Sequence, residues 1–284
     1  MKADLHMHTK YSFDGEKEVD EIIQLAKEAG MDLISITDHN QVEGSLRCMA
    51  DNRIECISGI EIDCFDGETI HHILGYGCDL TDPRFIVLKE NYEKELVNLT
   101  HKRIDMFNTM FGLTLSLSDI KKEYPQKTIT NIEITKYMFK NIEHEAFKPY
   151  ITGERKHNPI ANFYWDHLAF RKPGYIHMNL PSTQDVIDLI HDTRGIAIIA
   201  HPMIMGVPLE YYDQMTEIDG IEACCSYHSP SQVQEVIAYA KAKKMLITCG
   251  SDYHGINKPN IHIGQCNEPE DFNDEWIKEL LDRL

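Results

Sequence analysis

Histidines and carboxylates that could bind metal ions recur at the ends of short apolar runs along this chain. His6 and His8 are two residues apart in the first run, and in an extended segment this spacing places both imidazoles on one face. His201 ends a later run, and Asp252 and His254 end the last one with the same spacing of two. A histidine alone serves many roles, so the prediction of metal binding rests on these patterns occurring together.

Further candidates lie in or beside neighbouring runs. His39 ends the second run, and Asp14 lies in an Asp-Gly turn that could fold its carboxylate back over the first. Glu61 lies within an apolar run, where a carboxylate is unfavourable unless an ion pair or a metal offsets its charge. His71 and His72 are adjacent, so only one of them faces the site if the segment is a strand, and the spacing does not decide which.

In total, six histidines and three carboxylates lie at the ends of the predicted strands or in the loops beside them. Imidazole and carboxylate ligands suit zinc, manganese or iron, and the absence of cysteine from these positions argues against a structural cysteine-rich zinc site. One tetrahedral or octahedral ion needs fewer than nine ligands, so the set predicts a cluster of two or three divalent ions. His228 follows another apolar run, and it could be a ligand, a substrate contact or a core histidine.

The elements that must position these residues are predicted to be buried strands alternating with helices. The apolar runs are short and rich in β-branched residues, as buried strands are. Residues 19–29, 186–191 and 233–243 have the periodicity of amphipathic helices. This alternation predicts a parallel α/β architecture, either a barrel or an open sheet. Because the polar residues gather where the strands end, a barrel with one central site is favoured.

Residues 82–173 follow a different pattern and are predicted to form a helical insertion between barrel strands. An apolar stripe runs through 88–111, and two further helices are expected, the first from Ser118. The methionines and aromatic residues of these stripes are interpreted as the core of the insertion itself. The barrel domain is accordingly expected to be discontinuous and to comprise residues 1–80 and 175–284.

Composition restricts the classes of function. The formal charge of −18 argues against binding to duplex nucleic acid, since an acidic surface repels phosphates. No apolar run reaches the roughly 20 residues that span a bilayer, and the first residues lack the apolar block of a secretory signal. A cytoplasmic protein without membrane association is therefore expected. The 8 cysteines form no Cys-x-x-Cys pair and are expected to be reduced.

Five motifs, taken in order, resemble those of the PHP (polymerase and histidinol phosphatase) phosphoesterases. They are Asp4-Leu5-His6-Met7-His8-Thr9, Thr37-Asp38-His39, Gly59-Ile60-Glu61-Ile62, Ala200-His201-Pro202 and Gly250-Ser251-Asp252-Tyr253-His254. The resemblance implies a distorted seven-stranded, TIM-like (β/α) barrel that holds a trinuclear metal site. For the first ion, the implied ligands are His6, His8, Glu61 and Asp252. For the second, they are Glu61 as a bridge, His72 and His201. For the third, they are Asp14, His39 and His254. The resemblance thus selects His72 over His71.

The insertion resembles the cap of the PHP branch that acts on nucleoside 3′,5′-bisphosphates and on the 5′ ends of short oligonucleotides. This resemblance implies a phosphoesterase that hydrolyses phosphate monoesters of nucleotides with a metal-bridging hydroxide. Glu61 and Asp252 would belong to the catalytic centre, and His228, or a water that it orients, would protonate the leaving oxygen. The expected partner is a small phosphorylated substrate, a nucleotide.

One segment departs from that branch. The branch commonly has an Arg-Pro-His-like segment at the start of a cap helix, where this chain has Thr130-Asn131-Ile132-Glu133. A bound phosphate would then need other cations, and the candidates for substrate binding are Arg155, Lys156, His157, Arg171 and Lys172. Each of these also fits an ordinary solvated surface residue.

Three other functions fit parts of the pattern. A histidinol-phosphate phosphatase would share the metal site but usually organises the insertion differently. A barrel amidohydrolase also uses His-x-His but usually has a modified lysine as its bridge, a place that Glu61 fills here. A PHP module that binds metal without catalysis would be expected to have lost ligands, whereas this set is complete.

Overall fold

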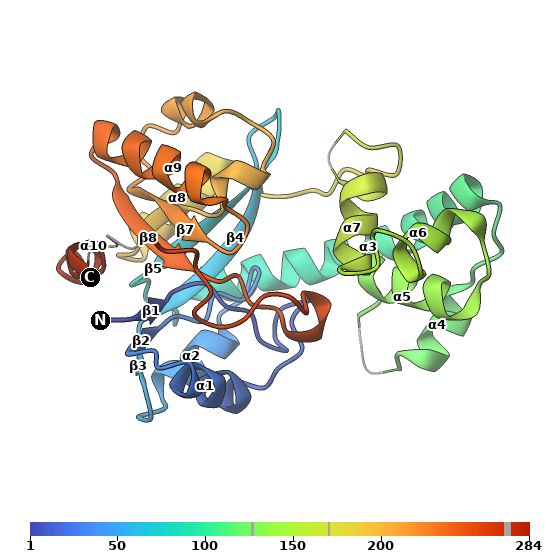
Figure 1. Ribbon diagram of the computed structural model, residues 1–284, viewed down its shortest axis with the longest axis horizontal. Helices are drawn as coiled ribbons and strands as arrows, with labels where there is room; N and C mark the ends of the chain where they lie inside the picture. Colours follow the sequence, from blue (N-terminus) through green and yellow to red (C-terminus); the bar gives the residue numbers. More distant parts are fainter. Residues whose placement is uncertain (126–127, 170, 270–273) are drawn as a thin grey trace. The chain divides into compact units, whose positions relative to one another are not determined.

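The computed structural model describes residues 1–125, 128–169, 171–269 and 274–284 (Figure 1). The described chain divides into two compact units. Unit 1 comprises Met1–Leu88, Leu180–Ile256 and Ile261–Leu284, and unit 2 comprises Lys89–Asn179 and Asn257–Asn260. The sequence pattern predicts the corresponding limits at 80–82 and 173–175.

Unit 1 contains two β-sheets among its described residues. The smaller sheet is parallel and consists, in spatial order, of β1 (Ala3–Asp4), β2 (Leu33–Ile34) and β3 (Glu55–Cys56). The larger sheet consists, in spatial order, of β4 (Gly59–Phe65), β5 (Ile70–Tyr76), β6 (Ile196–Ile199), β7 (Gly220–Cys225) and β8 (Leu246–Gly250). An isolated parallel bridge between Met7 and Tyr253 joins the segment after β1 to the segment after β8, and another between His39 and Glu61 joins the segment after β2 to β4. The mixed α/β fold agrees with the prediction, but the strands form two sheets where a single seven-stranded barrel was implied.

Strand β5 corrects the prediction of a parallel arrangement. It pairs antiparallel with both β4 and β6. Residues 66–69 alone join β4 to β5, and a parallel crossover needs about a dozen residues or more, so this connection must form a hairpin. The hairpin register places Asp63 opposite His72. Glu61 is two residues from Asp63 and therefore lies on the same face of the sheet.

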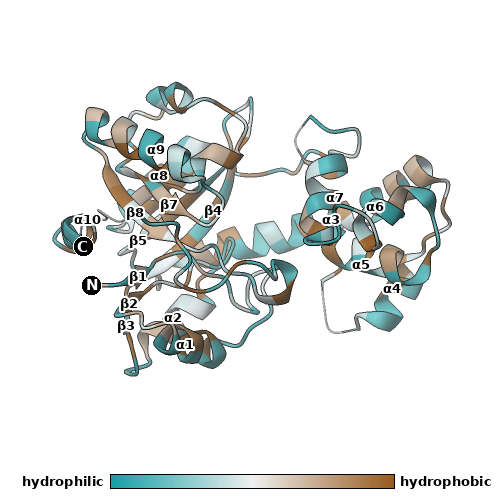
Figure 2. Cartoon of the chain, in the orientation of Figure 1, coloured by the Kyte–Doolittle hydropathy of each residue, from teal (hydrophilic) through white to brown (hydrophobic). Residues whose placement is uncertain are grey.

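Helices cover the strands of unit 1 from outside. They are α1 (Val19–Glu28), α2 (Glu43–Met49), α8 (Thr183–Asp192), α9 (Pro230–Lys243) and α10 (Asp274–Leu281). Helices α8 and α9 lie on one face of the larger sheet (Figure 1). The start of α9 is fixed by a capping box in which Ser229 and Gln232 bond each other's backbone N–H groups. Figure 2 shows hydrophobic strands beneath helices whose outer faces are hydrophilic, as an amphipathic pattern requires.

Unit 2 is helical in its described part. Helix α3 (Pro83–Phe111) begins in unit 1 and continues into unit 2, where it is followed by α4 (Leu117–Glu123), α5 (Asn131–Asn141), α6 (Lys148–Ile151) and α7 (Pro159–Phe163). As predicted, its apolar stripes form a core of their own, which includes Phe107, Phe147 and Phe163. Short helical turns complete the described chain at Glu145–Phe147, Tyr164–Leu168, Pro202–Ile204, Leu209–Gln214 and Gly255–Asn257.

The segment that departs from the expected arginine motif has a structural role in unit 2. Thr130 is the N-cap of α5, and its hydroxyl accepts a hydrogen bond from the backbone N–H of Ile132 at 3.1 Å. The side chain of Glu133 accepts in return from the backbone N–H of Thr130 at 3.0 Å, which completes a capping box. These residues therefore stabilise the start of the helix.

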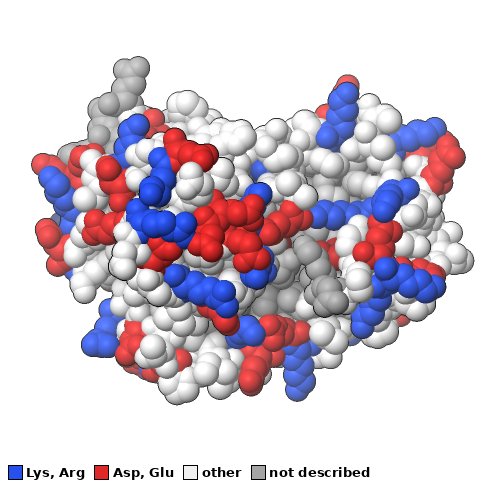
Figure 3. Space-filling view, turned by 90° about the horizontal axis from the view of Figure 1, so that it is seen from below, with Lys and Arg blue, Asp and Glu red and all other residues white. Residues whose placement is uncertain are grey.

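Charged residues of both signs are interspersed on the face that Figure 3 shows. Lysine and arginine side chains lie among aspartate and glutamate side chains there, so the described residues of this face form no continuous basic stripe. No helix in the described ranges is long and apolar enough to cross a membrane.

Candidate metal centre

All nine residues of the predicted metal site lie in unit 1, where eight of them form three overlapping groups and His201 lies 3.2 Å from Glu61. Within each of these three groups, the ligand atoms all lie within 4.8 Å of one another. These groups are His6, His8, Glu61 and Asp252; then His8, Asp14, His39 and His254; then His39, Glu61 and His72. The first is the set that the family resemblance implies for one ion. The second adds His8 to the implied set, and the third has His39 beside the implied pair.

Glu61 stands at the centre because its two carboxylate oxygens face different histidines. Oε2 lies 3.1 Å from Nε2 of both His6 and His8. Oε1 lies 3.0 Å from Nδ1 of His72 and 3.2 Å from Nε2 of His201. The side chain is fully buried, so these imidazoles take the place of its water shell. A carboxylate that divides its oxygens in this way has the geometry of a bridge between two ions.

The polar atoms around His8 are arranged better for coordinating a metal ion than for hydrogen bonding to one another. Nε2 of His8 is buried and lies 3.1 Å from carboxylate oxygens of both Glu61 and Asp252. It makes no hydrogen bond of acceptable geometry with any described residue. Buried polar atoms normally have hydrogen-bond partners. A nitrogen lone pair that faces the same point as two carboxylate oxygens is therefore typical of a metal coordination shell. The donor set therefore fits a divalent ion at this point.

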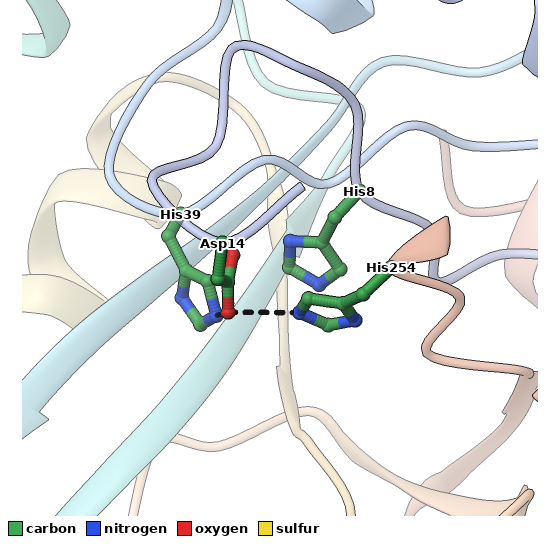
Figure 4. Close-up of side chains that lie close together, drawn as sticks. All are labelled: His8, Asp14, His39 and His254. Carbon is green, nitrogen blue, oxygen red and sulfur yellow. Dashed lines mark ion pairs between the residues drawn. The ribbon is translucent and has the colours of Figure 1, made fainter. Parts of the chain in front are cut away.

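Asp14 closes the site from the loop that follows the first strand (Figure 4). Its Oδ2 lies 2.9 Å from Nε2 of His254 and 3.6 Å from Nε2 of His39. Figure 4 shows that these side chains and His8 point toward one another. The hydroxyl of Ser12 donates to Oδ1 of Asp14 at 2.6 Å, which fixes the carboxylate. The turn thus carries Asp14 over the strand end, where the sequence analysis expected it.

Two carboxylates outside the predicted set hold the histidines in place. Oε1 of Glu222, on β7, lies 2.9 Å from Nδ1 of His6, and its Oε2 accepts from the backbone N–H of His201 at 2.8 Å. Oδ1 of Asp63 lies 2.7 Å from Nδ1 of His39. Such partners fix the tautomer and the orientation of a ligating imidazole. The sequence held a signal for both, because Glu222 is a carboxylate inside an apolar strand and Asp63 is two residues from Glu61.

The charges of the site depend on one another. Burial acts to raise the pKa of the Glu61 carboxyl, but His39, His6 and His72 outweigh it and hold the pKa well below its ordinary value. Burial acts to lower the pKa of His6, but the carboxylates around it, led by Glu222, raise the pKa well above its ordinary value. The pKa of His39 rises to about 10 for the same reason. The carboxylates thus attract positive charge to this site, as protons or as metal ions, and metal binding must displace protons.

The backbone is strained at two residues of the predicted metal site. His201 has φ +27° and Asp252 has φ +57°, a region that residues other than glycine avoid at a cost of about 1–3 kcal/mol. Gly250 allows β8 to approach closely, since a Cβ there would lie 2.2 Å from Cβ of His6. Strained ligands of this kind persist only where the surrounding structure fixes them.

His228 is buried beside the cluster, and its ring nitrogens face backbone groups. Its Nδ1 lies 2.8 Å from the carbonyl oxygen of Ala223, and its Nε2 accepts from the backbone N–H of Met203 at 3.4 Å. Burial lowers the pKa of His228, which favours the neutral ring. Protonation of a leaving group by His228 stays a prediction. It would require Nε2 to give up the long bond to Met203, to take up a proton from solvent and to donate that proton to the substrate.

The five basic candidates for substrate binding belong to unit 2, whereas the nine residues of the cluster belong to unit 1. Arg155 is paired with Asp166 through contacts of 2.6 Å and 3.1 Å, and Nδ1 of His157 lies 3.1 Å from the carbonyl oxygen of Glu154. Substrate binding by Arg155, Lys156, His157, Arg171 and Lys172 therefore stays a prediction.

Comparison with known proteins identifies the family of this chain. The model of the PHP domain matches residues 4–157, which is more than half of the chain. The chain belongs to the PHP domain family. The resemblance inferred from the five sequence motifs is thereby confirmed.

Relatives within the family are similar over nearly their whole length. A protein of Chromobacterium violaceum named 3′,5′-nucleoside bisphosphate phosphatase is 23% identical over 278 residues, which cover 93% of this chain and 91% of the relative. A 5′-3′ exoribonuclease of Haemophilus influenzae is 25% identical over 264 residues, which cover 89% of this chain and 90% of the relative.

Solved structures have the same fold. A protein of Chromobacterium violaceum described as an amidohydrolase, with bound sulfate and no metal, aligns with a TM-score of 0.81 at 21% identity over 100% of this chain and 97% of its own. A protein of Bifidobacterium adolescentis described as a putative metal-dependent phosphoesterase aligns with a TM-score of 0.76 at 21% identity over 99% of this chain and 96% of its own. At these identities the likeness establishes the fold of this PHP chain.

Proposed function

We propose that this chain is a metal-dependent phosphoesterase that hydrolyses phosphate monoesters of nucleotides. The observation that carries the proposal is the division of the two Glu61 oxygens between the His6–His8 pair and the His72–His201 pair. A buried bridging carboxylate brings two ions close enough to act on one phosphoryl group. The family membership and the names of the relatives support the same reaction class.

The proposed centre holds three divalent ions, of zinc, manganese or iron. His6, His8, Glu61 and Asp252 would bind the first, Glu61, His72 and His201 the second, and Asp14, His39 and His254 the third. When bound, the ions would polarise the phosphoryl oxygens and lower the pKa of water, the nucleophile that attacks phosphorus. Three carboxylates against three divalent ions leave a charge of about +3, which suits a phosphate monoester dianion.

The residues around the ions position them and admit the substrate. Glu222 and Asp63 fix the rings of His6 and His39, so that the opposite ring nitrogens point into the centre. The side chain of His72 is 25% exposed while that of Glu61 is fully buried. A phosphate would therefore approach from the side of His72. His228 is proposed to protonate the leaving oxygen, directly or through a water that it orients.

The finer architecture is proposed on the same basis. We infer that the two sheets surround the centre as one distorted barrel of seven strands. The bridges after β1 and β2 would join β1 to β8 and β2 to β4, with β3 outside the ring. Residues 82–173 are proposed as a helical cap inserted between barrel strands. Basic residues of that cap are proposed to contact the second phosphate of a nucleotide substrate.

The choice of a nucleotide substrate rests on two arguments. Two relatives that match over most of this chain are named 3′,5′-nucleoside bisphosphate phosphatase and 5′-3′ exoribonuclease. The net charge of −18 argues against long duplexes but is compatible with a small phosphorylated substrate drawn to a local positive centre. The alternatives are a histidinol-phosphate phosphatase, a barrel amidohydrolase and a PHP module that binds metal without catalysis.

A substrate panel separates these possibilities. In the presence of Mn²⁺, the assay would measure phosphate released from adenosine 3′,5′-bisphosphate and from histidinol phosphate, and phosphate or mononucleotide released from a 5′-phosphorylated oligonucleotide. Nitrophenol released from p-nitrophenyl acetate would report on a non-phosphate ester. We expect turnover of the bisphosphate, of the oligonucleotide or of both. Turnover of histidinol phosphate alone would contradict the nucleotide assignment. Hydrolysis of the acetate alone would contradict the phosphoesterase assignment.

A further inference from the structure

A second cluster of metal-binding side chains lies in unit 1 and shares no residue with the proposed centre. The side chains of Cys249, Cys266 and Glu268 have ligand atoms that all lie within 4.8 Å of one another. Both cysteines are buried, whereas Glu268 is exposed. Two thiols and a carboxylate differ in chemistry from the imidazole-rich centre, because thiolates select softer ions.

The cluster is built into the junction between the first and last strands. Cys249 lies in β8, and its thiol donates to the carbonyl oxygen of Ala3 in β1 at 3.5 Å. Cys266 lies in the segment that follows β8. In a regular tetrahedron around zinc, with Zn–S of about 2.3 Å, two thiolate sulfurs are about 3.8 Å apart. The spacing of the cluster therefore requires little movement to enclose one ion.

The backbone on either side of Cys266 is fixed. The N–H of Gly264 donates to Oδ2 of Asp4 at 2.7 Å. The side-chain amide of Asn267 donates to the carbonyl oxygens of Cys225, Ser226 and His228 at 3.2, 3.0 and 3.1 Å. These bonds tie the segment around Cys266 to β1 and to the end of β7, so Cys266 is held near Cys249 before any ion binds. A preformed thiol pair of this kind loses little conformational freedom on binding.

We propose that Cys249, Cys266 and Glu268 bind one thiophilic divalent ion, such as zinc. Each thiol releases its proton to solvent as it becomes a ligand. The carboxylate of Glu268 is exposed, so an ion from solvent can bind it first and then reach the buried sulfurs. A water, or the carbonyl oxygen of Ala3, completes four-coordination. The ion joins β8 to the segment after it, and β8 leads directly to Asp252.

Two features favour an ion over a disulfide between the same thiols. Both sulfurs are buried, and oxidation is fastest at exposed thiolates. A third donor lies within reach, and a disulfide has no use for a carboxylate.

The test uses Co²⁺ as the probe on the full chain, freed of metal and kept reduced. Thiolate-to-cobalt charge-transfer absorption in the near ultraviolet distinguishes cobalt bound to cysteines from cobalt in the main centre, because the nine residues of that centre include no cysteine. We expect a band that saturates at one thiolate-bound cobalt per chain. Glu268→Gln should weaken cobalt binding to the site by about tenfold or more, since loss of even an outer-shell partner has an effect of that size. Cys266→Ala should abolish the band.

The matched control is Cys78→Ala, which removes a buried thiol outside the cluster and should leave the band unchanged. If Cys266→Ala fails to fold, Glu268→Gln still decides the matter, because it alters an exposed side chain. The proposal is overturned if the wild-type chain shows no thiolate band, or if the band persists unchanged in both variants. A Cys249–Cys266 disulfide in chain purified without reductant, with no band after reduction, overturns it as well. None of these outcomes depends on phosphate hydrolysis, so this site and the proposed function can fail separately.

Discussion

Replacement of Glu222 by glutamine tests whether the proposed centre depends on a residue that binds no ion itself. The carboxylate accepts two hydrogen bonds, from Nδ1 of His6 at 2.9 Å and from the backbone N–H of His201 at 2.8 Å. With Nδ1 protonated, the lone pair on Nε2 of His6 points toward Glu61 and Asp252. Glutamine has one accepting oxygen, so its amide N–H₂ must face one of the two donors.

The structure sets the size of the effect. Glu222 is fully buried, so water cannot replace the lost acceptor. A hydrogen bond to a charged group contributes about 1.5–3 kcal/mol, and a buried donor left without a partner costs about 1–3 kcal/mol. Loss of an outer-shell partner usually weakens metal binding by about 10–100-fold. We therefore expect Glu222→Gln to raise the Kd for Mn²⁺ by about 10–100-fold.

The assay is competition between metal-free protein and a fluorescent chelator, with circular dichroism to verify folding. The matched control is Glu235→Gln, the same chemical change at an exposed position in α9. This control should bind Mn²⁺ as the wild type does. The reasoning is refuted if folded Glu222→Gln binds Mn²⁺ within threefold of the wild type, or if both variants lose affinity equally.

Three further predictions follow from the geometry. Asp63→Asn should weaken Mn²⁺ binding by about tenfold, because the ring of His39 loses its charged partner at 2.7 Å; equal affinities in the chelator assay would contradict this. In metal-free protein, protonated histidines such as His39 stabilise the fold below their ordinary pKa of 6.5, and this contribution is lost as pH rises through the folded pKa of about 10. The lowered pKa of the Glu61 carboxyl has the opposite effect on stability, because its contribution to the stability of the fold is lost as pH falls below 4.5 toward the folded pKa. Metal-free Tm should therefore be highest between about pH 4.5 and 6.5 and fall above it, and a Tm that rises from pH 6.5 to 9 would argue against the charge assignment. Phe163→Ala should destabilise unit 2 by about 3–5 kcal/mol in urea unfolding because the ring is fully buried, whereas Trp165→Ala, at a 42% exposed position, should have a much smaller effect; similar losses would show that this core is wrongly described.

Much of the centre was predictable because its residues follow simple spacing rules. His6 and His8 share a face, as a spacing of two in an extended segment requires, and their ring centroids lie 5.2 Å apart. Glu61 was conspicuous because an apolar strand cannot bury a carboxylate without partners. The same rule applied to β7 would have identified Glu222. That residue was missed because no neighbouring histidine in the sequence drew attention to it.

Other features depend on contacts between segments far apart in the chain. Spacing could not decide between His71 and His72, and the hairpin register decides it, since His72 faces Glu61 and His71 instead contacts Asp66 at 2.8 Å. The antiparallel pairing of β5 was missed because the pattern of apolar residues is the same for either direction. The surroundings of His228 were equally hidden, because both of its backbone partners depend on how the strand ends fold.

The central claim is that the clustered histidines and carboxylates bind the ions that hydrolyse a nucleotide phosphate. Release of phosphate from adenosine 3′,5′-bisphosphate tests it most directly, measured in the wild type and in Asp252→Asn, after chelation and again after Mn²⁺ is added back. We predict that chelation abolishes release, that Mn²⁺ restores it in the wild type, and that Asp252→Asn stays at least about 100-fold slower than the restored enzyme, a loss of about 2.7 kcal/mol in transition-state stabilisation. Undiminished release in the presence of chelator, or equal rates in the wild type and Asp252→Asn, would contradict the claim.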